Sequence, residues 1–124
     1  MSYNVMVVDD SRVVLAEMKK LLGDSEFEVV SYCRCGADAI EGYAGVKPDV
    51  VTMDIVMPGI DGVETTKQLL DKFPDARIVL VSSLTYYADA VDWRAMGAKG
   101  FVYKPFSQAE LLKGLRGAVG LPVE

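Results

Sequence analysis

The stretch "VVTMDIVMPG" (residues 50–59) decides the fold of this chain, because it joins a buried strand to a loop. Its first four residues are almost continuously apolar, and Asp54 follows them directly. A strand that is apolar along its whole length is covered on both faces, as in parallel sheets. A carboxylate at the end of such a strand is costly unless a positive charge compensates it. The rest of the chain must therefore supply covering helices and a compensating charge.

Apolar residues recur with strand and helix periodicities in strict alternation. The predicted strands cover residues 4–10, 27–33, 49–53, 77–81 and 100–103, and the predicted helices cover 11–23, 36–46, 61–73, 86–97 and 107–119. Ser11, Asp61 and Ser107 are predicted N-caps, and Glu110 would complete a capping box with Ser107. Five β-α units predict an α/β fold: an open, doubly wound parallel sheet of five strands with helices on both sides.

Polar side chains gather where four of these strands end. They are Asp9 and Asp10, Asp54, Ser82 and Ser83, and Lys104 with Pro105. Open parallel sheets bind ligands at the carboxyl ends of their strands. We therefore expect three carboxylates, a pair of hydroxyl groups and an ammonium group to converge on one edge of the sheet.

This set of groups indicates phosphoryl chemistry. Three close carboxylates repel one another and favour a divalent cation, and oxygen ligands at a partly open site suit Mg²⁺, with Mn²⁺ as the alternative. A carboxylate that faces a phosphoryl donor can act as the nucleophile, while the cation and an ammonium group neutralise the transferring group. Asp54 is thus predicted to be phosphorylated, with Lys104 as the compensating charge.

Length and composition exclude several classes of protein. The 124 residues fit one domain, residues 1–124. No apolar run is long enough to span a membrane and no signal peptide is recognisable, so we expect a cytoplasmic protein without membrane contact. A net charge of −5 argues against direct binding to nucleic acid.

The chain contains no histidine, and its two cysteines, Cys33 and Cys35, form a single C-x-C. Two thiols are too few for a tetrahedral zinc site, and the spacing differs from the C-x-x-C of redox enzymes. We interpret them as ordinary residues at the end of a strand. The lack of histidine excludes phosphohistidine formation within this chain.

The sequence strongly resembles the receiver domain of two-component response regulators, such as those of chemotaxis and of phosphorelays. The matching pieces are "VMVVDDSR", "PDVVTMDIVMPGIDG", "IVLVSS" and "GAKGFVYKPF", which are spread from about residue 4 to residue 117. The resemblance implies a flavodoxin-like fold with the strand order 2-1-3-4-5.

The resemblance also implies a role for each site residue. Asp54 would accept a phosphoryl group from a phosphohistidine on a sensor histidine kinase or a phosphotransfer protein. Asp9 and Asp10 would bind Mg²⁺ together with Asp54 and the backbone carbonyl of Val56. Lys104 would pair with the phosphoryl group, and its peptide bond to Pro105 is similar to one that is cis in the family.

Ser82 and Phe101 resemble the switch hydroxyl and the switch aromatic residue of the family. Their movement would change the surface formed by the fourth helix, the fifth strand and the fifth helix, which contacts an output protein or effector domain. On the predicted fourth helix, Val91 and Ala95 would face the core. Helical spacing would leave Trp93 largely exposed beside Tyr86 and Ala90, as a partner surface with Phe101; the alternative is a Trp93 ring that lies flat against a neighbouring helix or the Arg94 side chain.

The chain departs from the family at Val56 and Leu84, which are apolar where some relatives carry polar side chains that position the hydrolytic water. We therefore predict slow self-dephosphorylation, and no enzymatic activity beyond the protein's own phosphorylation and dephosphorylation. An excised receiver of a larger transcription factor or hybrid kinase is an alternative. A Mg²⁺-dependent phosphatase with an Asp nucleophile is less favoured, because it typically needs a second Asp where Val56 stands. A nucleotide-binding flavodoxin-like protein would need a Gly-rich phosphate loop, which is absent.

Overall fold

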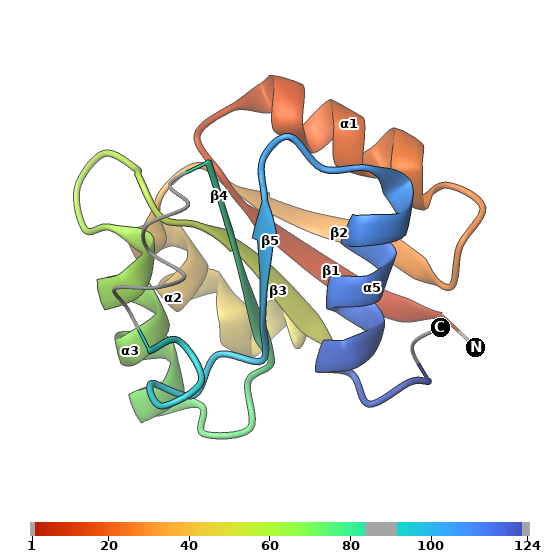
Figure 1. The fold of residues 1–124 in the computed structure, drawn as a ribbon. Helices are drawn as coiled ribbons and strands as arrows, with labels where there is room; N and C mark the ends of the chain where they lie inside the picture. The colour runs from red at the N-terminus through yellow and green to blue at the C-terminus, as the bar shows by residue number, and fades with distance from the viewer. Residues whose placement is uncertain (1, 84–91, 123–124) are drawn as a thin grey trace.

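The computed structural model describes residues 2–83 and 92–122, and these form a parallel sheet between two layers of helices (Figure 1). The strands are β1 (Tyr3–Val8), β2 (Phe27–Cys33), β3 (Val50–Asp54), β4 (Ile78–Ser82) and β5 (Gly100–Tyr103). The helices are α1 (Arg12–Leu22), α2 (Gly36–Val46), α3 (Gly62–Lys72) and α5 (Gln108–Ala118). All four strand pairings are parallel, in the order β2-β1-β3-β4-β5, which confirms the predicted fold.

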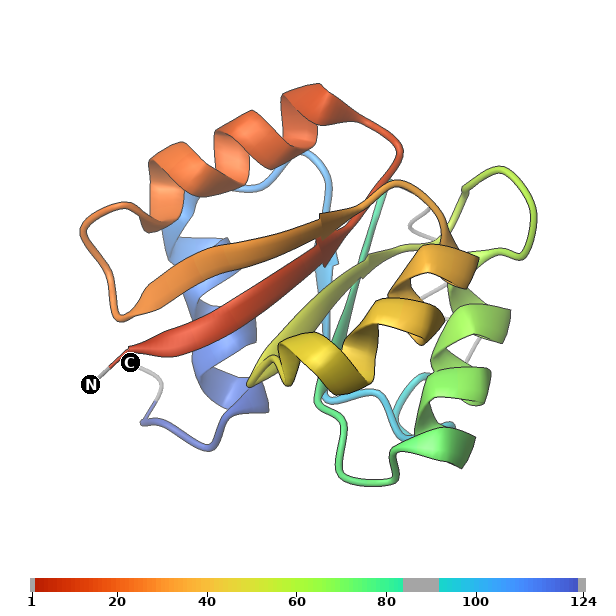
Figure 2. The same ribbon diagram turned by 180° about the vertical axis from the view of Figure 1, so that it is seen from behind.

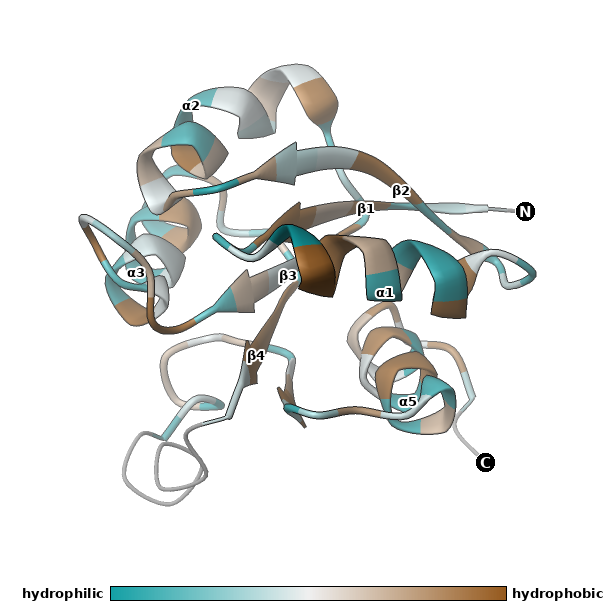
Figure 3. Ribbon diagram, turned by 90° about the horizontal axis from the view of Figure 1, so that it is seen from above, coloured by the Kyte–Doolittle hydropathy of each residue, from teal (hydrophilic) through white to brown (hydrophobic). Residues whose placement is uncertain are grey.

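Helices α1 and α5 cover one face of the sheet and α2 and α3 cover the other (Figures 1 and 2). Met18 and Leu22 of α1 share one core with Leu111 and Leu115 of α5. Ala39 of α2 and Leu69 of α3 belong to the second core, on the opposite face. Strands β3 and β4 are buried along their whole length, as expected for a sheet covered on both sides, and β4 is mostly apolar (Figure 3).

The helix starts follow the predicted capping chemistry. The Ser11 hydroxyl accepts a hydrogen bond from the Val14 amide, and the Asp61 carboxylate accepts one from the Glu64 amide. Ser107 and Glu110 form the complete capping box at the start of α5. Each cap satisfies a backbone donor that the helix itself leaves unpaired, and so fixes where the helix begins.

The predicted helix over residues 86–97 is not borne out in its described part. Residues 93–97 form successive turns, and residues 86–91 lie outside the described part of the chain. The Asp92 carboxylate accepts a hydrogen bond from the Ala95 amide, and the Ala98 amide bonds the Trp93 carbonyl. Gly97 has a φ of 100°, outside the helical region, so the turns end there.

Cys33 is the buried last residue of β2, and Cys35 precedes α2, so both lie where the strand ends, as predicted. Within the described ranges, no helix is both long enough and apolar enough to cross a membrane.

Candidate functional site

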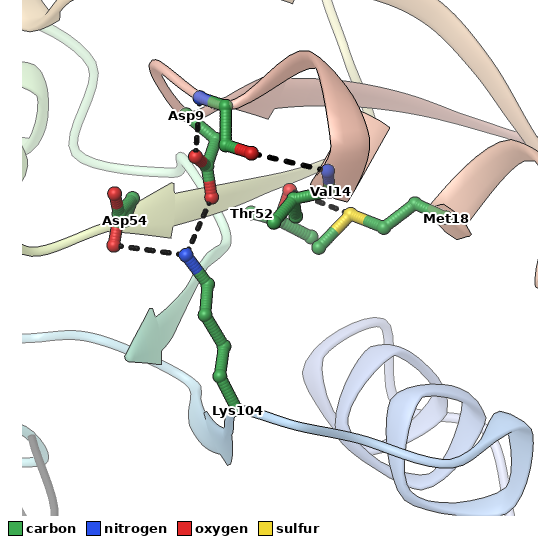
Figure 4. Close-up of polar contacts among 7 residues, drawn as sticks. Asp9, Val14, Met18, Thr52, Asp54 and Lys104 are labelled. Atoms are coloured by element: carbon green, nitrogen blue, oxygen red, sulfur yellow. Dashed lines mark hydrogen bonds and ion pairs between the residues drawn. The ribbon is translucent and has the colours of Figure 1, made fainter. Parts of the chain in front are cut away.

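Three strands deliver charged groups to one edge of the sheet. Asp9 follows β1, Asp54 ends β3, and Lys104 follows β5. The Lys104 ammonium nitrogen lies 2.8 Å from Oδ2 of Asp9 and 3.3 Å from Oδ1 of Asp54 (Figure 4). The predicted convergence is therefore observed for the acids and the ammonium group, and Lys104 supplies the compensating charge for the buried acid.

Backbone contacts hold Asp9 in place. Its amide donates to the Cys33 carbonyl at 3.0 Å, which ties the end of β1 to the end of β2. Its Oδ1 accepts a hydrogen bond of 2.9 Å from the Ser11 amide, so the same carboxylate also fixes the start of α1. The remaining oxygen, Oδ2, points toward Lys104 (Figure 4).

The backbone of Asp54 is held by the start of α3. The Gly62 amide donates to the Ile55 carbonyl at 2.8 Å, and a Cβ atom at position 62 would overlap the Asp54 carbonyl oxygen. Glycine is required here because the helix and the strand end touch through their backbones. Below the site, the buried Thr52 hydroxyl contacts the Met18 sulfur of α1 at 3.6 Å.

The site carries a surplus of negative charge. Asp9 and Asp54 are only 2% and 7% exposed. Burial, and then the charge of Asp9, raise the pKa of Asp54 even though Lys104 acts in the opposite direction. Burial by itself would lower the pKa of Lys104, but its hydrogen bond to Asp9 and the charges of both acids outweigh burial and raise it. One ammonium group therefore does not fully balance the acids that face it.

The acids have the chemistry of a site for a hard cation. Asp9, Asp10 and Asp54 each offer a carboxylate oxygen, and these atoms lie within 4.8 Å of one another. Asp10 is exposed, so the cluster opens to solvent on that side. Oxygen ligands with open positions suit Mg²⁺ or Mn²⁺, and a cation would offset the surplus charge. The side chain of Val56 is 61% exposed, and a role for its carbonyl stays a prediction.

Ser82 and Phe101 lie on the other face of the sheet. Ser82 ends β4, is 2% exposed, and follows Ile78 and Leu80 of the core beneath α2 and α3. Phe101 is half-buried and packs against the same core. The Lys104 amide donates to the Ser82 carbonyl at 2.9 Å, so Ser82 and the charged cluster share a backbone contact. The switch roles of the two residues stay predictions.

The structure corrects the expected burial of Trp93 and Ala95, and it agrees with the alternative in which the Trp93 ring lies against the Arg94 side chain. Trp93 is half-buried against the core rather than largely exposed, and the Arg94 guanidinium lies 4.3 Å from the centre of its ring. Ala95, expected in the core, is exposed. Helical spacing placed both wrongly because residues 93–97 form turns. Tyr86 and Ala90 lie outside the described residues.

Sequence reasoning missed Tyr103, which precedes Lys104. Its side chain is 41% exposed and its ring contacts that of Phe101. The two aromatic rings and Trp93 line a groove of about 470 Å³ between β5 and α5. The period of two along a strand could have placed Tyr103 on the face of Phe101. The Lys104–Pro105 peptide bond is cis, as the resemblance implied.

Comparisons with known proteins agree with this architecture. Residues 5–116 match the family model of the response regulator receiver domain. The chain is 38% identical over 114 residues to a chemotaxis protein CheY from Listeria monocytogenes, covering 92% of this chain and 96% of that protein. It is 35% identical over 115 residues to a chemotaxis protein CheY from Bacillus subtilis, covering 93% of this chain and 96% of that protein.

Solved structures show the same fold. The response regulator domain of Thermotoga maritima CheB superimposes with a TM-score of 0.86 at 34% identity, covering 98% of this chain and 99% of that one. CheY in a CheX-CheY-BeF3-Mg complex from Borrelia burgdorferi gives a TM-score of 0.85 at 28% identity, covering 92% of this chain and 87% of that one. Together with the family match, these likenesses show that the chain belongs to the response regulator receiver domain family.

Proposed function

We propose that this receiver accepts a phosphoryl group on Asp54 from a phosphohistidine of a sensor histidine kinase or a phosphotransfer protein. An oxygen of Asp54 forms a bond to phosphorus as the phosphorus–nitrogen bond of the phosphohistidine breaks. The imidazole ring keeps the bonding electron pair and, protonated at its other nitrogen, leaves as a neutral ring. The observation that carries this proposal is the buried Asp54 carboxylate within 3.3 Å of the Lys104 ammonium group, in a cluster of three acids.

Each charged group of the cluster has a task in this reaction. Lys104 lies between Asp9 and Asp54 and would pair with an oxygen of the incoming phosphoryl group. Asp9, Asp10, Asp54 and the Val56 carbonyl would hold Mg²⁺, or Mn²⁺ in its place. The cation would neutralise charge on the transferring group. The Borrelia relative, whose complex contains BeF3 and Mg, supports this choice of cation.

The output would follow from a two-state equilibrium. The phosphoryl group would draw the Ser82 hydroxyl toward Asp54, and Phe101 would turn inward on the same face of the sheet. A shift from a mostly inactive to a mostly active population needs roughly 3 to 5 kcal/mol of differential binding. An ion pair to Lys104 and one or two charge-assisted hydrogen bonds are sufficient.

The groove that contains Trp93 and Phe101 would contact the output protein or effector domain. Three basic residues, Arg94, Lys99 and Lys113, line it together with one acid, Glu110. On a chain of net charge −5 this excess of positive charge favours a partner with an acidic segment. Tyr86 and Ala90 remain predicted members of this surface. The chemotaxis relatives support a chemotaxis-type signal.

Incubation with acetyl phosphate and Mg²⁺, followed by intact mass spectrometry, tests the proposal. We expect one added phosphoryl group on the wild type, none on Asp54→Ala, and unchanged labelling of Asp71→Asn, a matched change of an exposed acid on α3. A phosphoryl group on Asp54→Ala would refute Asp54 as the acceptor. Omission of Mg²⁺ with EDTA should slow labelling strongly, whereas equal rates would refute the metal site.

A further inference from the structure

Tyr103, rather than Phe101, is the aromatic neighbour of Ser82 across the sheet. The β4–β5 register pairs Ser82 with Tyr103 and Leu80 with Phe101. Paired residues of parallel strands project from the same face, about 4.8 Å apart, whereas Phe101 lies about 7 Å further along β5. If the Ser82 side chain moves away, Tyr103 is therefore the aromatic residue nearest to the space that it leaves.

The two aromatic rings of β5 are in contact with each other. Their centres are 5.1 Å apart and their planes are tilted by 53°, which is an attractive geometry for aromatic pairs. Phe101 is half-buried against the core, whereas Tyr103 is 41% exposed. Tyr103 thus has apolar surface that it can bury by moving inward, and it cannot move far without displacing Phe101.

We propose that Tyr103 couples Ser82 to Phe101 and the groove. When the phosphoryl group draws the Ser82 hydroxyl toward Asp54, the Tyr103 ring moves into the space beside Ser82. The Phe101 ring moves with it, and the groove that both line with Trp93 changes shape. This inference rests on the proposed phosphorylation of Asp54 and adds a residue through which the signal passes.

The ring of Tyr103, not its hydroxyl group, carries the coupling in this arrangement. Tyr103→Phe keeps the ring and should behave like the wild type. Tyr103→Leu removes the ring contact with Phe101 and should uncouple the groove from the site. Tyr3→Leu is a matched control, because Tyr3 forms a similar pair with Phe27, 5.5 Å between ring centres, at the opposite end of β1.

Trp93 reports on the groove because it is the only tryptophan of the chain and lines the groove beside Phe101 and Tyr103. The fluorescence of Trp93 is measured before and after addition of beryllofluoride and Mg²⁺, and acetyl phosphate labelling is followed separately by intact mass. We expect a response in the wild type, Tyr103→Phe and Tyr3→Leu. In Tyr103→Leu the response should fall by about fivefold or more while Asp54 is still phosphorylated.

Each other result is decisive. A full response in Tyr103→Leu, a lost response in Tyr103→Phe, or no response in a phosphorylated wild type would overturn the coupling role and leave the phosphorylation of Asp54 standing. A wild type that takes up no phosphoryl group would instead overturn the proposed function, and the coupling with it. Circular dichroism tests whether each variant is folded. If Tyr103→Leu is unfolded, a lost response in Tyr103→Phe would still overturn the coupling.

Discussion

Asp54→Asn should stabilise the metal-free protein, because the charge at this position is unfavourable in the fold. At an effective dielectric constant of 20, Lys104 at 3.3 Å contributes about 5 kcal/mol of attraction to the carboxylate. The Asp9 carboxylate, within 4.8 Å of the Asp54 carboxylate, opposes this attraction with at least about 3.5 kcal/mol of repulsion. Asp10 adds to the repulsion, and burial of the charge costs several kcal/mol more. We expect the neutral amide to raise the free energy of unfolding by about 1–3 kcal/mol at neutral pH.

The dependence on pH follows from the pKa of Asp54. Because the folded-state pKa is raised above its ordinary value of 3.8, the unfavourable contribution of Asp54 to wild-type stability shrinks as the pH falls and its carboxyl group becomes protonated. The advantage of Asp54→Asn should therefore be largest near about pH 7 and shrink toward about pH 4. A variant whose advantage grows on acidification would contradict the charge argument.

Urea denaturation in EDTA, followed by Trp93 fluorescence and circular dichroism, measures the difference. Asp71→Asn, on the exposed side of α3, is the control and should change stability by less than about 0.5 kcal/mol. Added Mg²⁺ should stabilise the wild type more than Asp54→Asn, since the variant lacks one carboxylate. An Asp54→Asn protein that is equally or less stable than the wild type at neutral pH would refute the reasoning.

Three further predictions follow from single contacts. Gly62→Ala should cost about 2 kcal/mol or more and slow labelling by acetyl phosphate, because its Cβ overlaps the Asp54 carbonyl; a wild-type rate of labelling and a wild-type urea midpoint would contradict this. Glu26→Gln should cost about 0.5–1 kcal/mol, since it removes a partly exposed ion pair with Arg116, 2.9 Å long. In the wild type the hydrogen bond to Arg116 lowers the pKa of Glu26. The ion pair therefore stabilises the fold near neutral pH, and this contribution is lost as the pH falls through the lowered pKa, which urea titrations at two pH values test. Val56→Asn should shorten the lifetime of the phosphorylated protein, because it places a polar group at an exposed position near Asp54. Intact mass spectrometry follows the loss of the phosphoryl group with time. A half-life of seconds in the wild type would show that its self-dephosphorylation is not slow.

The fold could be predicted from the sequence because each strand and most helices carry their own local signals. Asp61 and Ser107 cap helices where predicted, and β5 covers exactly the predicted residues. The convergence of Asp54 and Lys104 follows from the parallel topology, which brings strand ends together whatever their separation in the chain.

Periodicity could not place Trp93 and Ala95, because it assumes a regular helix. Residues 93–97 form turns instead, which end at Gly97 with its φ of 100°. Nor could the sequence show that Lys104 lies closer to Asp9 than to Asp54, since that distance depends on side-chain packing at the edge of the sheet. Tyr103 could not be singled out because its proximity to Ser82 depends on the register of β4 and β5, which the sequence alone does not show.

The charged site residues and the predicted switch residues lie on different faces of the sheet. Asp9 and Asp54 continue the face covered by α1 and α5, whereas Ser82 and Phe101 belong to the opposite face. The acids and the switch residues thus start from opposite faces but meet at the same end of the sheet, where the Lys104 amide donates to the Ser82 carbonyl. Under the proposed function, a substitution on the side of α1 would alter the contact with the phosphoryl donor, whereas one around Phe101 would alter the contact with the output partner, and Ser82 would connect the two.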